Sequence, residues 1–150
     1  MTPEKLPIWE RVPGYEMPVE EAPVNSTMTF KFIGKLNIPS IGIELPIQSV
    51  WSYQRLAYTP CRYAGNVYND GFVIIAHRYS SHFAGIDKLP MGAAVNVTDL
   101  DGNTFRYKVV AIETLEADQT AELLNGEYAL SLMTCTSGAS KRVVVRCERR

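Results

Sequence analysis

From Thr29 onwards the chain is a succession of short apolar runs, each closed by proline, glycine or a polar turn. Runs of this length, several of them with period-2 alternation, are typical of β-strands. They cover residues 30–38, 41–47, 71–77, 93–98, 104–115, 128–135 and 141–148. Asp101-Gly102, between two of these runs, is a strong hairpin signal. About eight strands with few helices predict a mainly β fold, a closed or nearly closed barrel.

The remaining segments are expected to be short helices and loops. Ser52–Tyr58 is predicted to be a helix with Ser52 as N-cap, and Ala84–Leu89 and Ala117–Leu124 are also predicted to be helical. Pro60 and Gly65 are expected to bound a loop. The run from Gly71 to His77 is almost continuously apolar, which is expected for a strand that is covered on both faces.

Prolines divide the chain into two parts. They recur through residues 1–27, at positions 3, 7, 13, 18 and 23. Because proline fixes φ and removes a hydrogen-bond donor, we expect residues 1–27 to form an extended N-terminal arm or spacer. Residues 28–150 then form a single domain, an ordinary size for one core. The alternative for the arm is a lid over a binding groove, because Trp9 and Tyr15 are large apolar groups to leave in water.

The composition excludes some partners. The chain has 15 basic and 16 acidic residues, a net charge of −1, which gives no indication of a surface for nucleic acid or anionic membrane. No apolar stretch approaches the roughly 18 residues of a membrane helix, and no signal peptide is evident. On composition alone a cytosolic protein is the alternative to an exported one.

Three chemically versatile side chains lie at the ends of predicted strands. Cys135 ends one apolar run, Arg142 opens the next after a short polar loop, and His77 ends an earlier run. A thiolate attacks carbonyls, a histidine near its ordinary pKa transfers protons at neutral pH, and a guanidinium stabilises a developing oxyanion. We therefore predict Cys135 as nucleophile, His77 as general acid and base, and Arg142 as oxyanion or substrate clamp.

Each assignment has a rival within the chain. His82 is the other histidine, and it is expected to shape the groove or to be solvated. Arg146 lies four positions beyond Arg142 and therefore on the same face of the strand.

Taken together, these residues resemble the sortases, the cysteine transpeptidases of Gram-positive cell surfaces. That family carries a Thr-Leu-x-Thr-Cys strand end, an arginine opening the next strand, and a histidine ending an earlier strand. The corresponding residues here are Ser131-Leu132-Met133-Thr134-Cys135, Arg142 and Ala76-His77. The wider similarity runs from about Phe30 to Arg149, and residues 36–43 look like the first hairpin of the family.

The resemblance implies a fold, an activity, partners and a location. The fold is a closed eight-stranded sortase-type β-barrel with a few short helices. The activity is cleavage of an LPxTG-like sorting signal of a surface protein through a thioacyl-enzyme, followed by transfer to an amine. That amine belongs to a lipid-linked peptidoglycan precursor or to a pilin lysine. The location is the extracellular face of the cell membrane, through an N-terminal anchor segment that is absent from this sequence.

Cysteine and acid positions leave two further alternatives. Cys61 and Cys147 could form a disulfide bridge in an oxidising exterior. No cofactor motif and no zinc-type spacing is present, so we predict no cofactor and no metal site. Calcium is the alternative, with oxygen ligands from Asp99, Asp101, Glu113, Glu116 and Asp118.

Three other classes of protein compete with this interpretation. An L,D-transpeptidase has glycine before its cysteine, where this chain has Thr134. A papain-like protease places cysteine before histidine, whereas His77 precedes Cys135 here. A non-catalytic surface β module needs no thiol, and reaction of Cys135 with a methanethiosulfonate distinguishes it from an enzyme.

Overall fold

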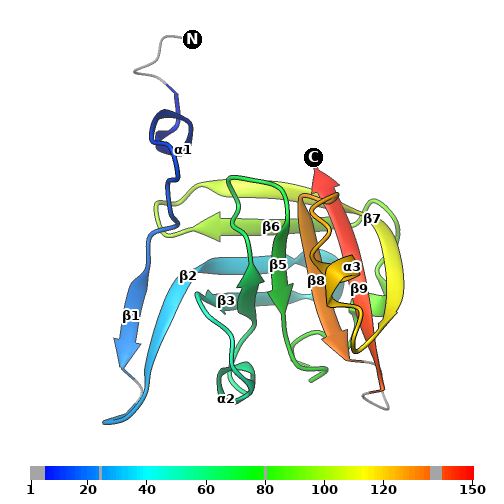
Figure 1. Cartoon of the computed structure of the whole chain (residues 1–150). Helices are drawn as coiled ribbons and strands as arrows, with labels where there is room; N and C mark the ends of the chain where they lie inside the picture. The colour runs from blue at the N-terminus through cyan, green and yellow to red at the C-terminus, as the bar shows by residue number, and fades with distance from the viewer. Residues whose placement is uncertain (1–5, 24, 80, 136–139) are drawn as a thin grey trace.

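The computed structural model describes residues 6–23, 25–79, 81–135 and 140–150. An N-terminal arm carries helix α1 (Ile8–Arg11) and strand β1 (Glu20–Pro23). The later strands are β2 (Thr29–Ile38), β3 (Ile43–Gln48), β4 (Cys61–Ala64), β5 (Phe72–Ile75), β6 (Ala94–Asp99), β7 (Thr104–Glu116), β8 (Leu130–Cys135) and β9 (Lys141–Arg149). The helices among them are η2 (Pro39–Ile41), α2 (Tyr53–Leu56), η3 (Ile86–Lys88) and α3 (Thr120–Leu123). Figure 1 shows the strands wrapped around a common core, with β1 and α3 on opposite sides.

Strand β2 closes the barrel because it pairs with neighbours on both of its edges. The sheet order is β1-β2-β3-β4-β5-β8-β9-β7-β6, and β6 pairs back to β2. The register of β2 against β3 shifts between Phe32 and Gly34. Strand β1 pairs with β2 up to Phe32, whereas β6 pairs with it from Gly34 onwards. Strands β2 to β9 thus form the predicted closed eight-stranded barrel, and β1 is an added edge strand.

Glycine is required at the point of closure. A Cβ atom at Gly34 would collide with the backbone carbonyl oxygen of Thr98 on β6. Strands β2 and β6 therefore approach each other more closely than any residue with a side chain allows.

Alternation along the strands divides the apolar side chains between two clusters. On β5, Phe72 and Ile74 belong to the large cluster inside the barrel, whereas Val73 and Ile75 belong to a smaller outer cluster. The other members of the outer cluster are Leu56, Cys61, Leu123 and Val144. All four residues of β5 are buried, which confirms that this strand is covered on both faces.

The predicted helices are present in shorter form. Helix α2 lies within the segment expected to be helical, and the Ser52 hydroxyl accepts a hydrogen bond from the Arg55 amide at 3.0 Å, as expected for an N-cap. Helices η3 and α3 lie within the other two predicted segments.

The prediction of a loop between Pro60 and Gly65 was wrong, because these residues include strand β4. This strand pairs antiparallel with β5, for example through Cys61 and Ile75, and it forms one parallel pairing with Gln48 of β3. Its four residues show no clear alternation of buried and exposed side chains. Its neighbours in the sheet, rather than its own sequence pattern, define it as a strand.

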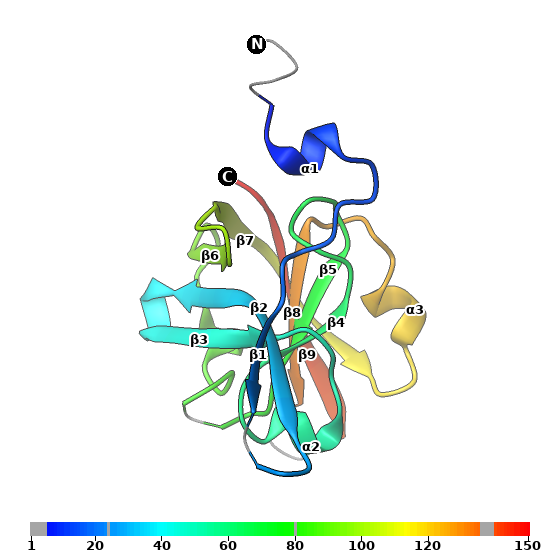
Figure 2. The same ribbon diagram turned by 90° about the vertical axis from the view of Figure 1, so that its left-hand side faces the viewer.

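The N-terminal arm lies against the barrel near the β6–β7 hairpin. The Trp9 ring stacks on Tyr68 with centroids 5.2 Å apart and meets Phe105 edge-on at 5.0 Å. The Tyr15 hydroxyl donates a hydrogen bond to Asp101 Oδ2 at 3.2 Å. Figure 2 shows the arm descending from α1 along the barrel into β1. The two aromatic groups that the sequence singles out are therefore packed on the domain.

The bridge suggested for Cys61 and Cys147 does not form, and both residues are buried free cysteines. Cys61 belongs to the outer cluster and Cys147 to the cluster inside the barrel. The sheet therefore separates the two sulfur atoms, which excludes the geometry of a disulfide.

Candidate active site

The ends of β5 and β8 lie side by side. The strands are parallel, with Ile75 opposite Met133, and the Ala76 amide donates to the Met133 carbonyl at 3.1 Å. The Thr134 hydroxyl, which is buried, donates to the Ala76 carbonyl at 2.9 Å. Two residues further along in this register, the backbone of His77 is level with that of Cys135, as the sequence predicts for two strands that end at the same edge of the sheet.

The start of β9 lies on the other side of β8. Cys135 is the last residue of β8, and its partner in the antiparallel pairing is Arg142. Residues 136–139 of the connecting loop lie outside the described residues. The backbone thus brings together Cys135 at the end of β8, Arg142 near the start of β9, and His77, which lies two residues beyond the end of β5.

A groove of about 180 Å³ lies over this rim. His77, Thr134 and Arg142 line it together with residues of α2, of β4 and of the segment that follows β7. The residues that contribute apolar surface are Trp51, Leu56, Tyr63, Ile75, Leu115, Leu123 and Met133. The groove is thus largely apolar, with a histidine and an arginine among its lining residues.

Helix α2 forms one wall of the groove, and hydrogen bonds from the buried Gln48 side chain anchor it to the barrel. The Gln48 side chain donates to the Arg55 carbonyl at 2.8 Å and to the Thr59 hydroxyl at 3.0 Å. Leu56 of the same helix is buried in the outer cluster. These contacts fix the short helix, which has too few residues to be stable alone.

The two histidines occupy different environments. His77 lines the groove, and its ring stacks on Tyr79 with centroids 4.8 Å apart. His82 is buried, and its ring also contacts Tyr79, with centroids 5.3 Å apart, so the prediction of a solvated His82 was wrong. Burial, and then the neighbouring His77, lower the pKa of His82. His82 is not among the residues that line the groove.

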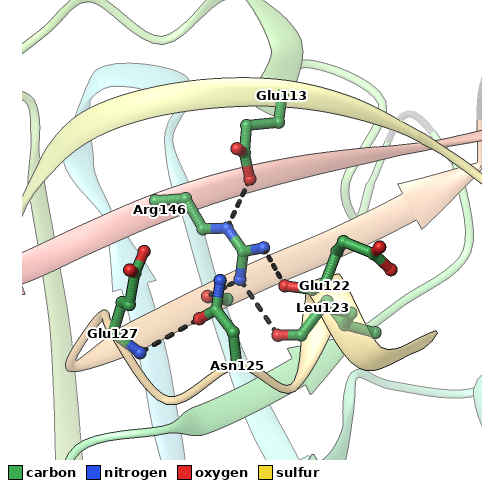
Figure 3. A network of polar contacts seen from close by, with 7 residues as sticks. Glu113, Glu122, Leu123, Asn125, Glu127 and Arg146 are labelled. Carbon is green, nitrogen blue, oxygen red and sulfur yellow. Dashed lines mark hydrogen bonds and ion pairs between the residues drawn. The ribbon is translucent and has the colours of Figure 1, made fainter. Parts of the chain in front are cut away.

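The two arginines of β9 are also separated by their surroundings. Arg142 lines the groove, whereas Arg146 does not and is only 1% exposed. The Nε of Arg146 donates to Glu113 Oε2 at 2.7 Å, and its Nη1 donates to the Ser131 hydroxyl at 2.8 Å. Two further bonds reach the carbonyls of α3, from Nη1 to Leu123 at 3.0 Å and from Nη2 to Glu122 at 2.6 Å. Figure 3 shows the Arg146 side chain between Glu113 and the end of α3.

Four of the five acids considered for calcium, Asp99, Asp101, Glu113 and Glu116, are engaged in separate contacts. Asp99 accepts hydrogen bonds from the amides of Asp101 and Asn103, and Glu113 pairs with Arg146. Glu116 lies 3.6 Å from the Lys141 ammonium. Within the described residues, no group of three or more histidines, cysteines and acids is arranged to hold a metal ion.

Two observations concern the arm and the membrane. No residue of the arm lines the groove, so the described arm does not act as a lid in this conformation. Across the described ranges, no helix has the length and apolar character that a membrane span requires.

The fold and the site define a closed β-barrel protein with a cysteine, a histidine and an arginine aligned at one rim of its sheet. The sequence model of the sortase domain family matches residues 36–150 of the chain, so this protein belongs to the sortase family. That membership removes the L,D-transpeptidase and papain-like alternatives. No curated protein sequence matches the chain significantly.

Solved structures of sortases have the same fold. Sortase A from Corynebacterium diphtheriae superposes with a TM-score of 0.72 and 24% identity, over 81% of this chain and 61% of that one. A sortase C from Streptococcus pneumoniae, studied for its catalysis and pilin substrate specificity, gives 0.71 and 27%, over 79% and 66%. Sortase C from Clostridium perfringens gives 0.66 and 28%, over 79% and 70%. The chain thus spans about two thirds of the length of these structures.

Proposed function

We propose that this chain is a cysteine transpeptidase that cleaves an LPxTG-like sorting signal and transfers the cleaved protein to an amine. The observation that carries the proposal is the placement of Cys135 and Arg142 at paired ends of β8 and β9, with His77 just beyond the end of the neighbouring β5, beside an apolar groove. Membership of the sortase family supports it.

The first half of the reaction forms a thioester. The Cys135 thiolate, beside a protonated His77, attacks the carbonyl carbon of the scissile peptide bond, and the carbonyl oxygen becomes an oxyanion. Arg142 stabilises that charge through its N–H donors, because a guanidinium keeps its proton at any physiological pH. The C–N bond then breaks, and His77 gives its proton to the departing amine. The acyl group remains on the sulfur.

The second half of the reaction releases the product. An incoming amine attacks the thioester carbon, His77 accepts a proton from that amine, and the Cys135 thiolate leaves. Water in place of the amine gives hydrolysis. The apolar walls of the groove suit the aliphatic part of the sorting signal and reduce the access of water.

Two amines fit the second half of the reaction, a lipid-linked peptidoglycan precursor and a pilin lysine. The pneumococcal sortase C is described with pilin substrate specificity, and another match is sortase C2 of the group B Streptococcus Pilus Island 1. These relatives support the pilin lysine as the acceptor to test first. Either acceptor places the enzyme on the extracellular face of the cell membrane.

A peptide-library assay tests this proposal. The protein is incubated with peptides that vary the sorting signal and with one of two amine acceptors. A glycine oligomer stands in for the peptidoglycan precursor, and a lysine-containing peptide stands in for the pilin. Mass spectrometry then identifies the cleaved and the transferred products. We expect LPxTG-like peptides to be joined to one of the two amines, and we expect Cys135→Ala and His77→Ala to form no product. A chain that consumes no peptide and whose Cys135 resists methanethiosulfonate is a non-catalytic surface module.

A further inference from the structure

Arg146 is an arginine in the interior of the protein that the proposed chemistry does not use. Its side chain is 1% exposed, and its charge is balanced by Glu113, which is 41% exposed. Its guanidinium also lies over the Tyr128 ring, with Cζ 5.2 Å from the centroid. An arginine this deeply buried is stable only when its donors are paired, and here bonds from all three guanidinium nitrogens satisfy that condition.

The partners of Arg146 belong to two different parts of the protein. Glu113 and Ser131 lie on the barrel strands β7 and β8, whereas the carbonyls of Glu122 and Leu123 end helix α3. The last carbonyls of a helix have no partner within it, so they accept bonds from outside. Two hydrogen bonds of Arg146 thus join the barrel to the last carbonyls of α3, while Glu116 of β7 and Gln119 bond each other at the start of the helix.

Helix α3 belongs to one wall of the groove. The residues of this wall that line the groove are Leu115, Glu116, Ala117, Gln119, Thr120 and Leu123. Arg142 lies on the same face of β9 as Arg146, two repeats of the strand alternation away, with Val144 between them. Leu115, the first residue of this wall, is paired with Arg142 across β7 and β9, so the wall that Arg146 contacts begins beside Arg142.

Stability alone does not require an ion pair at this place in the core. Replacing a buried ion pair by packed apolar groups is often neutral or stabilising. What an apolar residue cannot do is bind a carboxylate, a hydroxyl and two carbonyls at once, which the planar fork of a guanidinium does. The arrangement therefore specifies the position of α3 relative to the sheet.

We propose that Arg146 is a positioning residue, which fixes the wall of the groove formed by residues 115–123 and thereby sets the affinity for the peptide substrate. It acts through α3 and does not touch the reacting atoms. The part of the proposal that concerns substrate affinity rests on the proposed transpeptidase activity. The part that concerns the position of α3 does not.

Two substitutions test the role of Arg146. Arg146→Met keeps most of the side-chain volume and removes all hydrogen bonds of the guanidinium. Arg146→Lys keeps the positive charge but lacks the planar guanidinium with its several N–H donors. Loss of hydrogen bonds to a charged group allows local opening to increase about tenfold or more. We expect faster amide hydrogen exchange in residues 117–127 of Arg146→Met, with unchanged exchange in β5 and β8. Arg146→Lys should show an intermediate rate.

Kinetic constants give the second measurement. We expect Arg146→Met to raise KM for the sorting peptide about tenfold while kcat stays within about threefold, because the binding wall and not the reacting groups is disturbed. The rate at which a small methanethiosulfonate labels Cys135 should stay within about twofold of the wild-type rate, since that reagent does not need the wall.

Arg149→Met is the matched control, because Arg149 is another arginine of β9 that binds a carbonyl. Its Nη2 donates to the Val67 carbonyl at 3.0 Å, and its guanidinium lies over the Tyr107 ring. Neither contact involves α3, so exchange in residues 117–127 and KM should match the wild type. If Arg146→Met fails to fold, Ser131→Ala removes one barrel contact and Glu113→Ala removes the other, each keeping the arginine, and a smaller rise in exchange is then expected.

The possible outcomes test the two parts of the proposal separately. Unchanged exchange in residues 117–127 of a folded Arg146 variant overturns the positioning role. Faster exchange with unchanged KM overturns the role in substrate affinity. If the wild-type protein turns over no sorting peptide, the transpeptidase activity fails, and the exchange experiment still tests how α3 is held.

Discussion

Thr134→Val removes the hydroxyl that ties the end of β8 to the end of β5. Thr134 directly precedes Cys135 and is 3% exposed, and its hydroxyl donates to the Ala76 carbonyl at 2.9 Å, directly before His77. Valine has nearly the same shape but no hydroxyl, so the carbonyl of Ala76, itself a buried residue, loses this donor. An unsatisfied buried group costs about 1–3 kcal/mol.

We therefore expect the free energy of unfolding of Thr134→Val to fall by about 1–2 kcal/mol. For a chain of 150 residues this corresponds to a decrease in Tm of about 2–8 °C. Urea unfolding followed by fluorescence measures the change, and an unchanged m value shows that the folded state is as compact as before.

The same substitution should also lower activity. If the two strand ends shift relative to each other, the imidazole and the thiol lose their alignment, and kcat falls by about tenfold or more. Thr134→Ser is the control, because it keeps the hydroxyl and loses only a methyl group. A Thr134→Val protein that is as stable and as active as the wild type, with Thr134→Ser the weaker of the two, would refute the reasoning.

Two other predictions follow from the site and the core. Arg142→Ala should lower kcat and kcat/KM together by about 10²–10³, and Arg142→Lys should restore only part of the loss, because an ammonium has charge but no planar fork. Steady-state cleavage of a sorting peptide measures both, and a larger loss of kcat in Arg146→Ala than in Arg142→Ala would transfer the role to Arg146. Burial raises the pKa of Cys61 to about 11 and that of Cys147 to about 12. Both thiols stay protonated in the folded chain at pH values where the same thiols ionise in the unfolded chain. The contribution of the two protonated thiols to the free energy of unfolding is therefore complete below about pH 9 and is lost as the pH rises towards 12. Urea unfolding between pH 8 and 10 should show a shallower decline for Cys147→Ala than for the wild type, and equal slopes would contradict the assignment.

The barrel could be predicted from the sequence because its strands carry their own signals. The continuous apolar run of β5 and the Asp101-Gly102 turn before β7 identify their elements without any knowledge of their neighbours. Strand β4 was missed because its four residues are ordered by pairing with β5. The edge strand β1 lies in a segment whose prolines disfavour a central strand, and it pairs with β2 along one edge alone.

The alignment of the three candidate residues could be predicted because each lies at a strand end. The connection of Arg146 to α3 could not, since it joins residues that are more than twenty positions apart. One signal was present in the sequence. Arg146 interrupts an apolar run that continues to Cys147, and a charged residue inside a buried strand requires partners from elsewhere in the fold.

Detection of the acyl-enzyme tests the central claim most directly. The protein is mixed with an LPxTG-like peptide without an amine acceptor, and its intact mass is measured after acid quenching. We predict an added mass equal to the part of the peptide before the scissile bond, located on Cys135 by fragmentation and removed by hydroxylamine. The adduct should be absent from Cys135→Ala and present in Cys61→Ala and Cys147→Ala. Turnover of the peptide by Cys135→Ala, or an adduct on another residue, would contradict the account.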